Sequence, residues 1–145
     1  MFQRILIATD GSEYAERPVA HALALAKSLS AKLIAVTVTD IMPTGPYTPI
    51  PWQSDIERYE AAASASARKV LERVLEAARS LGVICETHHI ADQPAAEGIL
   101  ATSEQWCCDL IVMGLHGRHG LARLMLGSQV NKVVALSRIP VLVCR

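Results

Sequence analysis

Arg4–Thr9 reads RILIAT, a short apolar run that ends at Asp10-Gly11, and it has the form of a buried strand followed by a turn. A second run, Lys32–Thr39 (KLIAVTVT), is continuous and rich in β-branched residues, as expected of a strand covered on both faces. Between them, from Ala15 to Leu29, apolar residues recur at helical spacing. This alternation of strand and helix is typical of an α/β protein.

The alternation continues along the chain. Further helices are expected from Asp55 to Leu81, where Gly82 stands as a C-terminal cap, from Pro94 to Trp106, and from Ser128 to about Leu136. Further strands are expected at Val83–Ile90, Leu110–Met113 and Val141–Val143. The pattern predicts a single domain over residues 1–145, an open, parallel, five-stranded sheet with helices on both faces.

Composition excludes several classes of protein. The 145 residues are 51% hydrophobic but only 4% aromatic, so the core must be built from Ala, Val, Leu and Ile. No apolar run approaches the roughly 18 residues of a membrane helix. The 14 basic and 14 acidic side chains balance to zero net charge, which favours neither nucleic acid nor an acidic membrane as a partner. The first ten residues lack the length and cleavage site of a signal peptide, so we expect a cytoplasmic protein.

Two strand ends carry residues suited to binding. In open parallel sheets, ligands bind beyond the carboxyl ends of the strands, where the strand order reverses. The first strand ends at Thr9-Asp10-Gly11-Ser12, and the fourth is followed by a segment with glycines at 114, 117, 120 and 127. Glycine permits close backbone approach to a ligand, and the helix beginning at Ser128 offers its first N–H groups to phosphate. On residue types alone, the glycines fit a structural turn equally well, and Asp10 could simply cap its own turn.

The whole chain resembles the universal stress protein family. The resemblance rests on the opening ILIATDGS (Ile5–Ser12), on the order of elements and on the ending IPVLV (Ile139–Val143). Its most specific part is the family's ATP-binding signature G-x2-G-x9-G-[ST], which here falls on Gly114, Gly117, Gly127 and Ser128. The resemblance implies a Rossmann-like domain of the adenine nucleotide alpha hydrolase-like type that binds ATP with Mg²⁺. It also implies a homodimer that acts in the stress response.

The resemblance implies individual roles as well. Asp10, with Ala8 nearby, would meet the ribose or the metal–phosphate region, and Val38 would hold the adenine through its backbone. Met113 and Gly114 would flank the ribose. The residues around the phosphates would be His116, Gly117, Gly127, Ser128 and Gln129. The partner would be a second copy, paired through the last strand at Val141, Leu142 and Val143.

Other features leave the function open among three classes. His88 and His89 are adjacent on a strand and point to opposite faces, so they cannot both ligate one metal, and no metal site is predicted. The proline-rich loop Asp40–Trp52 fits either a functional lid or a mobile linker, and Trp52 could cover a nucleotide. No catalytic residue is predicted. The remaining functions are an ATP-sensing module, a slow ATPase or adenylate-transferring enzyme, and an interaction protein that needs no nucleotide.

Overall fold

The computed structural model describes residues 1–116 and 127–145, so the predicted site residue Gly117 lies outside the described residues. The strands are β1 (Arg4–Ala8), β2 (Lys32–Val38), β3 (Cys85–Ile90), β4 (Leu110–Gly114) and β5 (Val141–Cys144). The helices are a 3-10 turn η1 (Glu13–Ala15), α1 (Glu16–Leu29), α2 (Gln53–Leu81), α3 (Ala95–Gln105) and α4 (Ser128–Leu136). Each strand and α-helix expected from the sequence is present, with ends displaced by at most two residues.

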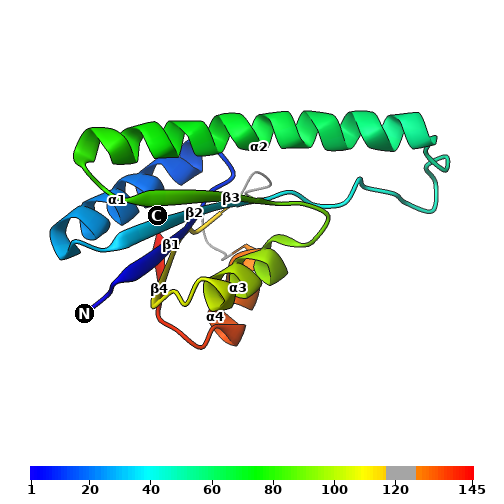
Figure 1. Ribbon diagram of the computed structural model, residues 1–145. Helices are drawn as coiled ribbons and strands as arrows, with labels where there is room; N and C mark the ends of the chain where they lie inside the picture. Colours follow the sequence, from blue (N-terminus) through cyan, green and yellow to red (C-terminus); the bar gives the residue numbers. More distant parts are fainter. Residues whose placement is uncertain (117–126) are drawn as a thin grey trace.

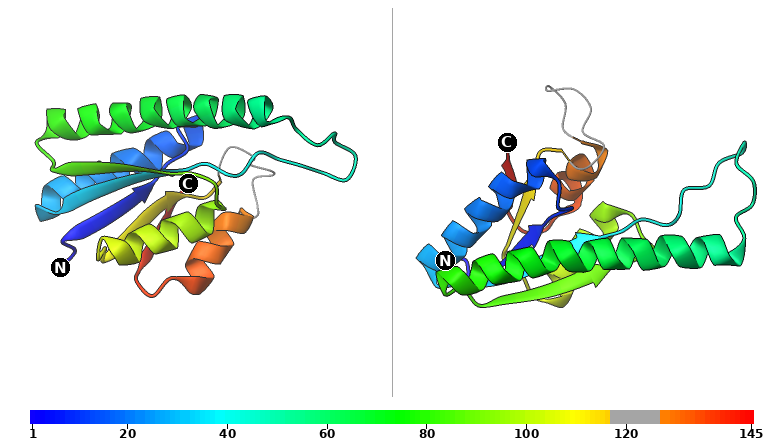
Figure 2. Two further views of the ribbon diagram at one scale, coloured as in Figure 1. Left: turned by 45° about the vertical axis from the view of Figure 1, so that its right-hand side comes forward. Right: turned by 90° about the horizontal axis from the view of Figure 1, so that it is seen from above.

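The five strands form one parallel sheet in the order β3-β2-β1-β4-β5. Helices α1 and α2 cover one face, and α3 and α4 cover the other (Figures 1 and 2). The predicted architecture is therefore confirmed. The strand order reverses between β1 and β4, and this is the point where open parallel sheets bind ligands.

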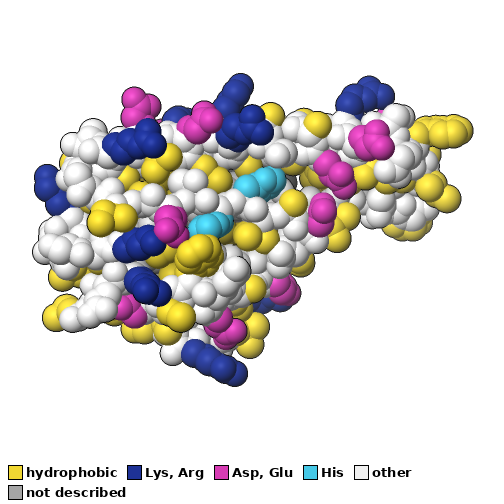
Figure 3. Space-filling view, viewed as in Figure 1, with side chains coloured by type: hydrophobic (Ala, Val, Ile, Leu, Met, Phe, Trp, Pro, Cys, Tyr) yellow, Lys and Arg dark blue, Asp and Glu magenta, His cyan; other side chains and the backbone are white. Residues whose placement is uncertain are grey.

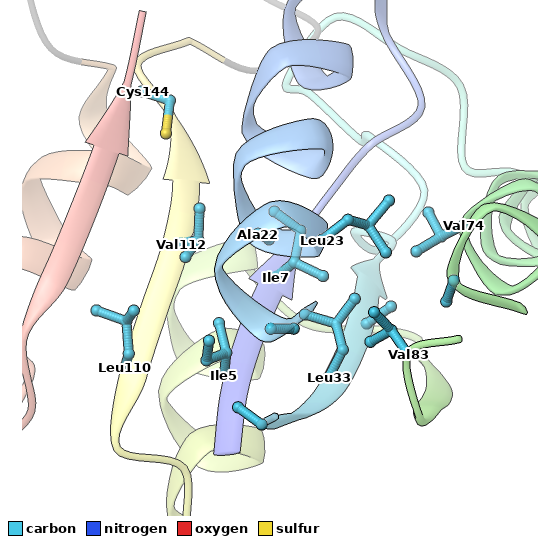
Figure 4. Packing of buried hydrophobic residues seen from close by; sticks show 14 of the residues in the cluster. Ile5, Ile7, Ala22, Leu23, Leu33, Val74, Val83, Leu110, Val112 and Cys144 are labelled. Atoms are coloured by element: carbon cyan, nitrogen blue, oxygen red, sulfur yellow. The ribbon is translucent and has the colours of Figure 1, made fainter. Parts of the chain in front are cut away.

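Alternate residues of each strand feed two separate hydrophobic clusters. Ile5 and Ile7 of β1 pack under α1 and α2, with Leu33 and Val112 beside them (Figure 4). Leu6, between the two isoleucines, faces α3 and α4. Because Ile5, Leu6 and Ile7 are all fully buried, β1 is the centre of the molecule and fixes the position of the turn that follows it.

The long helix α2 extends past the sheet. Its first half and the loop before it, residues 39–52, project away from the body (Figures 1 and 2). The helix ends as predicted at Gly82, whose φ of +71° is the left-handed conformation that suits a glycine cap. Within the described part of the chain, no helix combines the length and the apolar character needed to span a membrane.

Candidate functional site

The turn after β1 presents Asp10 at the carboxyl edge of the sheet. The Thr9 amide donates to the Val36 carbonyl (3.0 Å), and the buried Thr37 hydroxyl donates to the Thr9 carbonyl (2.9 Å), which ties the turn to β2. The Ser12 amide donates to Oδ1 of Asp10 (2.9 Å). Asp10 therefore does stabilise its own turn, the role that the sequence left open for it, and the same bond fixes where its carboxylate lies.

Gly11 is required in this turn for two reasons. Its φ is +75°, a conformation that side chains disfavour, and a Cβ there would overlap Cγ2 of Val70 in α2. The same Cβ would lie 3.2 Å from the guanidinium of Arg73. Helix α2 therefore packs directly on the turn that holds Asp10.

The two ends of the segment that carries glycines at 114, 117, 120 and 127 lie side by side beyond β4. The Leu115 amide donates to the Cys144 carbonyl (2.9 Å), and the Gly127 amide donates to the Leu115 carbonyl (3.3 Å). Helix α4 therefore begins directly beside the end of β4. Its N-cap is Gly127, which has no side chain with which to cap, so the first amides of α4 depend on other acceptors. Such a helix start is suited to phosphate.

An apolar floor lies between the ends of β1, β2 and β4. Met113 belongs to the cluster on the side of α3 and α4, and Ala8 and Val38 pack against that cluster. Gly98 of α3 lies against Val38, since a Cβ on Gly98 would be 2.8 Å and 2.9 Å from the two methyl carbons of Val38. Beyond Val38, the chain is held to β3 because the Thr39 amide donates to the Ile90 carbonyl (2.8 Å).

The structure thus brings most of the predicted residues to one edge of the sheet. They are Ala8, Asp10, Val38, Met113, Gly114, His116, Gly127 and Ser128. Gln129 has a different contact: its Oε1 accepts a hydrogen bond from the Ala96 amide at the start of α3 (2.9 Å). Because Pro94, the N-cap of α3, has no acceptor on its side chain, Gln129 supplies one from α4.

A groove beside the Asp10 turn was not anticipated from the sequence. It has a volume of about 780 Å³ and lies between the turn and one side of α2, where it is lined by Ser66, Lys69, Val70, Glu72, Arg73 and Glu76. The Ser12 hydroxyl is buried nearby and has no hydrogen-bond partner among the described residues. In the sequence, the charged residues of α2 have the pattern of any solvent-exposed side of a helix. The groove can be recognised only from the structure, in which α2 packs on Gly11.

The described residues contain no group of three or more His, Cys, Asp or Glu side chains that could hold a metal ion. The side chains of the adjacent His88 and His89 point to different surroundings, as predicted. His88 stacks on Trp106 with 4.4 Å between ring centroids, whereas Nε2 of His89 hydrogen-bonds the Thr39 hydroxyl (2.8 Å).

Comparisons with known proteins all point to one family. The model of the universal stress protein family matches residues 1–145. A universal stress protein of Thermus aquaticus is 35% identical over 145 residues, which cover 100% of both chains. One from Methanocaldococcus jannaschii is 32% identical over 145 residues, covering 100% of this chain and 83% of that protein.

Solved structures share the fold. UspA from Lactobacillus plantarum superposes with a TM-score of 0.85 at 23% identity, over 99% of this chain and 98% of that one. A universal stress protein in complex with cAMP superposes with a TM-score of 0.72 at 25% identity, over 99% of this chain and 97% of that one.

Proposed function

Because the chain belongs to the universal stress protein family, we propose that it is an ATP-binding member, a nucleotide-dependent regulator of the stress response in the cytoplasm. The adenine lies on the apolar floor against the backbone of Val38, close to Ala8. The ribose lies between Asp10 and the end of β4 at Met113 and Gly114. The phosphates lie among His116, Gly117, Gly127, Ser128 and Gln129, the last through its backbone, since its side-chain oxygen is bonded to Ala96.

One observation carries the proposal. The hydrogen bond from the Gly127 amide to the Leu115 carbonyl sets the start of α4 beside the end of β4. The strand order reverses between β4 and β1, so the same crevice is bordered by the Asp10 turn. An anion site at the start of a helix, a carboxylate and an apolar floor match the three parts of a nucleotide. The cAMP complex of a relative gives independent support for an adenine nucleotide.

The residues present also fit Mg²⁺ bound together with ATP. Mg²⁺ keeps several of its waters and is usually held by one or two carboxylates together with substrate phosphates, rather than by an all-protein cage. Asp10 supplies a carboxylate at the crevice. When bound, the ion would neutralise part of the charge on the phosphates. No residue is proposed as a catalyst, and bound ATP acts as a signal.

The protein is also proposed to form a homodimer through β5, with Val141, Leu142 and Val143 at its centre. β5 lies at the edge of the sheet. The carbonyl of Pro140 accepts a hydrogen bond from the Ile111 amide of β4, and that of Cys144 accepts one from Leu115, the residue after β4. By alternation the backbone groups of Val141 and Val143 therefore point outward. An unpaired edge of this kind pairs readily with another strand, here the same strand of a second copy.

The sharpest test of ATP binding is Gly127→Ala, measured by calorimetry. A Cβ at position 127 would lie 3.6 Å from the Leu115 carbonyl oxygen, an ordinary contact, so the fold accepts alanine there. The methyl group would stand where the phosphates approach the start of α4, and we expect ATP affinity to fall at least tenfold. Gly45→Ala in the exposed loop is the matched control, and it should bind as the wild type does. Equal ATP affinity in wild type and Gly127→Ala would refute the proposed site.

Two further measurements separate the other functions. Nucleotide released from the purified protein by acid, and read by absorbance, distinguishes an ATP-binding protein from one that needs no nucleotide. Turnover distinguishes a sensor from an enzyme, and we expect a rate well below the roughly 1–100 s⁻¹ of kinases. Asp10→Asn keeps an oxygen for the Ser12 amide while removing the charge. Fast hydrolysis that is lost in this variant would identify the protein as an ATPase instead.

A further inference from the structure

The start of α3 takes its cap from another helix. Pro94, the N-cap of α3, makes no side-chain hydrogen bond, because a proline ring carries no acceptor. The Ala96 amide instead donates to Oε1 of Gln129, which lies 33 residues further along the chain (2.9 Å). Helices usually take this acceptor from a Ser, Thr, Asp or Asn at their own N-cap. The first turn of α3 therefore depends on where α4 begins.

A second and weaker contact joins the same two helices. One turn into α4, Nζ of Lys132 lies 3.2 Å from Oε1 of Glu97. Both side chains are half exposed, and Figure 3 shows acidic and basic side chains mixed over the surface that α3 and α4 form, so this ion pair contributes little. The hydrogen bond from its own amide, and then that from Lys132, hold the pKa of Glu97 below its ordinary value of 4.5. The bond between Gln129 and Ala96 is the stronger of the two links.

The two linked helix starts stand at opposite ends of the proposed nucleotide. Gln129 is the second residue of α4 and follows Ser128, where the phosphates are proposed to lie. Ala96 precedes Gly98 by two residues, and Gly98 lies against Val38 at the proposed adenine floor. Ala96 is 1% exposed and belongs to the cluster that Val38 packs against. One hydrogen bond therefore connects the phosphate end of the site to the adenine end.

From these contacts we infer that Gln129 is a positioning residue, which holds the starts of α3 and α4 at the separation that ATP spans. The inference rests on the proposed function and adds how that site recognises its ligand. A ligand that reaches both ends gains affinity from their fixed separation, because binding at one end places the rest of the ligand at the other. Adenosine and tripolyphosphate each reach one end and gain nothing from that separation. The site therefore responds to the intact nucleotide rather than to either of its parts.

The test compares three variants of the full chain. In Gln129→Leu the side chain keeps a similar size and helix propensity but loses its acceptor, so the free energy of unfolding, measured in urea, should fall. Adding Pro94→Ser to this variant gives α3 an uncharged acceptor at its own N-cap, which should restore stability without restoring the contact to α4. Gln105→Leu makes the same substitution at the exposed last residue of α3 and should behave as wild type.

Ligand affinities separate a positioning role from a capping role. In Gln129→Leu we expect ATP affinity, measured by calorimetry, to fall about fivefold to tenfold, which is typical of coupling between two sites. The affinities of adenosine and tripolyphosphate, followed by NMR titration, should fall less than that of ATP. The double variant should regain stability and still bind ATP as weakly as the single variant. If Gln129→Leu alone does not fold, the double variant carries the same comparison of ATP with its two parts.

The Ala96 amide reports on the link directly. In wild type, tripolyphosphate bound at the start of α4 should shift the NMR signal of this amide, and in the two variants without Gln129 the response should vanish. The inference is overturned if ATP affinity is unchanged in Gln129→Leu, if either part of ATP loses as much affinity as ATP does, if Pro94→Ser restores ATP binding, or if the Ala96 signal of wild type does not respond. A wild type that binds neither ATP nor tripolyphosphate would instead refute the proposed function itself.

Discussion

Gly98→Ala should weaken the proposed adenine site from a distance, because α3 approaches β2 too closely for a side chain at this position. An ideal Cβ on Gly98 would lie 2.8 Å and 2.9 Å from the methyl carbons of Val38, and 3.4 Å from Cγ2 of Ile90. Carbon atoms at such distances overlap, so either α3 or β2 must move. Val38 is β-branched and stiff, so it cannot turn its methyl groups aside.

The expected magnitude follows from two opposing terms. Overpacking of this kind costs about 1–3 kcal/mol, whereas replacing glycine by alanine inside a helix returns about 1 kcal/mol. The free energy of unfolding, measured in urea, should therefore fall by about 0–2 kcal/mol. ATP affinity should fall as well. Displacement of the Val38 backbone would cost about 1 kcal/mol for one weakened hydrogen bond to the adenine, or roughly fivefold in affinity.

Two controls make the reasoning refutable. Gly82→Ala strains the left-handed cap of α2 but meets no atom within 4 Å, so it should lower stability and leave ATP affinity unchanged. Adding Val38→Ala to Gly98→Ala removes the overlapping methyl groups and should restore affinity. If Gly98→Ala raises stability by the full helix-propensity gain, α3 does not lie against Val38. If affinity does not recover in the double variant, the effect does not act through this contact.

Three further outcomes are expected. The hydrogen bond from Lys32 holds the pKa of Glu86 below its ordinary value of 4.5. Lys32→Met should therefore lower the free energy of unfolding at neutral pH, and urea titrations should show the difference between variant and wild type disappear as the pH falls through the folded-state pKa of Glu86. Burial raises the pKa of the Cys108 thiol to about 11, whereas Cys107 is exposed, so mass spectrometry should find iodoacetamide on Cys107 in the native protein and on Cys108 only after unfolding. Val143→Pro removes an outward-facing amide of β5 and should shift any dimer formed through that edge toward monomer in sedimentation equilibrium; an unchanged mass would exclude the edge as the interface.

The sequence predicts the fold well because the strands are buried on both faces. A continuous run rich in β-branched residues, such as Lys32–Thr39, leaves little choice between strand and helix, and Gly82 marks the end of α2 by its own conformation. The position of Asp10 can be predicted in the same way, because it directly follows a buried strand. The contacts between elements cannot be predicted, because spacing along the chain does not tell which side of α2 meets the Asp10 turn. Lys69, at a solvent-like position of that helix, borders the groove only because Gly11 lets the helix approach.

The glycines at this edge of the sheet do not all report on a ligand. A Cβ on Gly11 would overlap α2, so packing alone demands glycine there. Gly114, the first glycine of the signature, is also constrained, since its Cβ would lie 3.3 Å from Cγ of Pro18 and 3.4 Å from the Tyr14 carbonyl oxygen. Losing ATP binding on substitution of either residue would therefore reflect a displaced helix as readily as a blocked nucleotide. Gly127 differs, because its φ of −56° and its surroundings accept a side chain. Glycine at this position is not explained by the packing of the described residues, and the proposed binding of phosphate at the start of α4 would account for it.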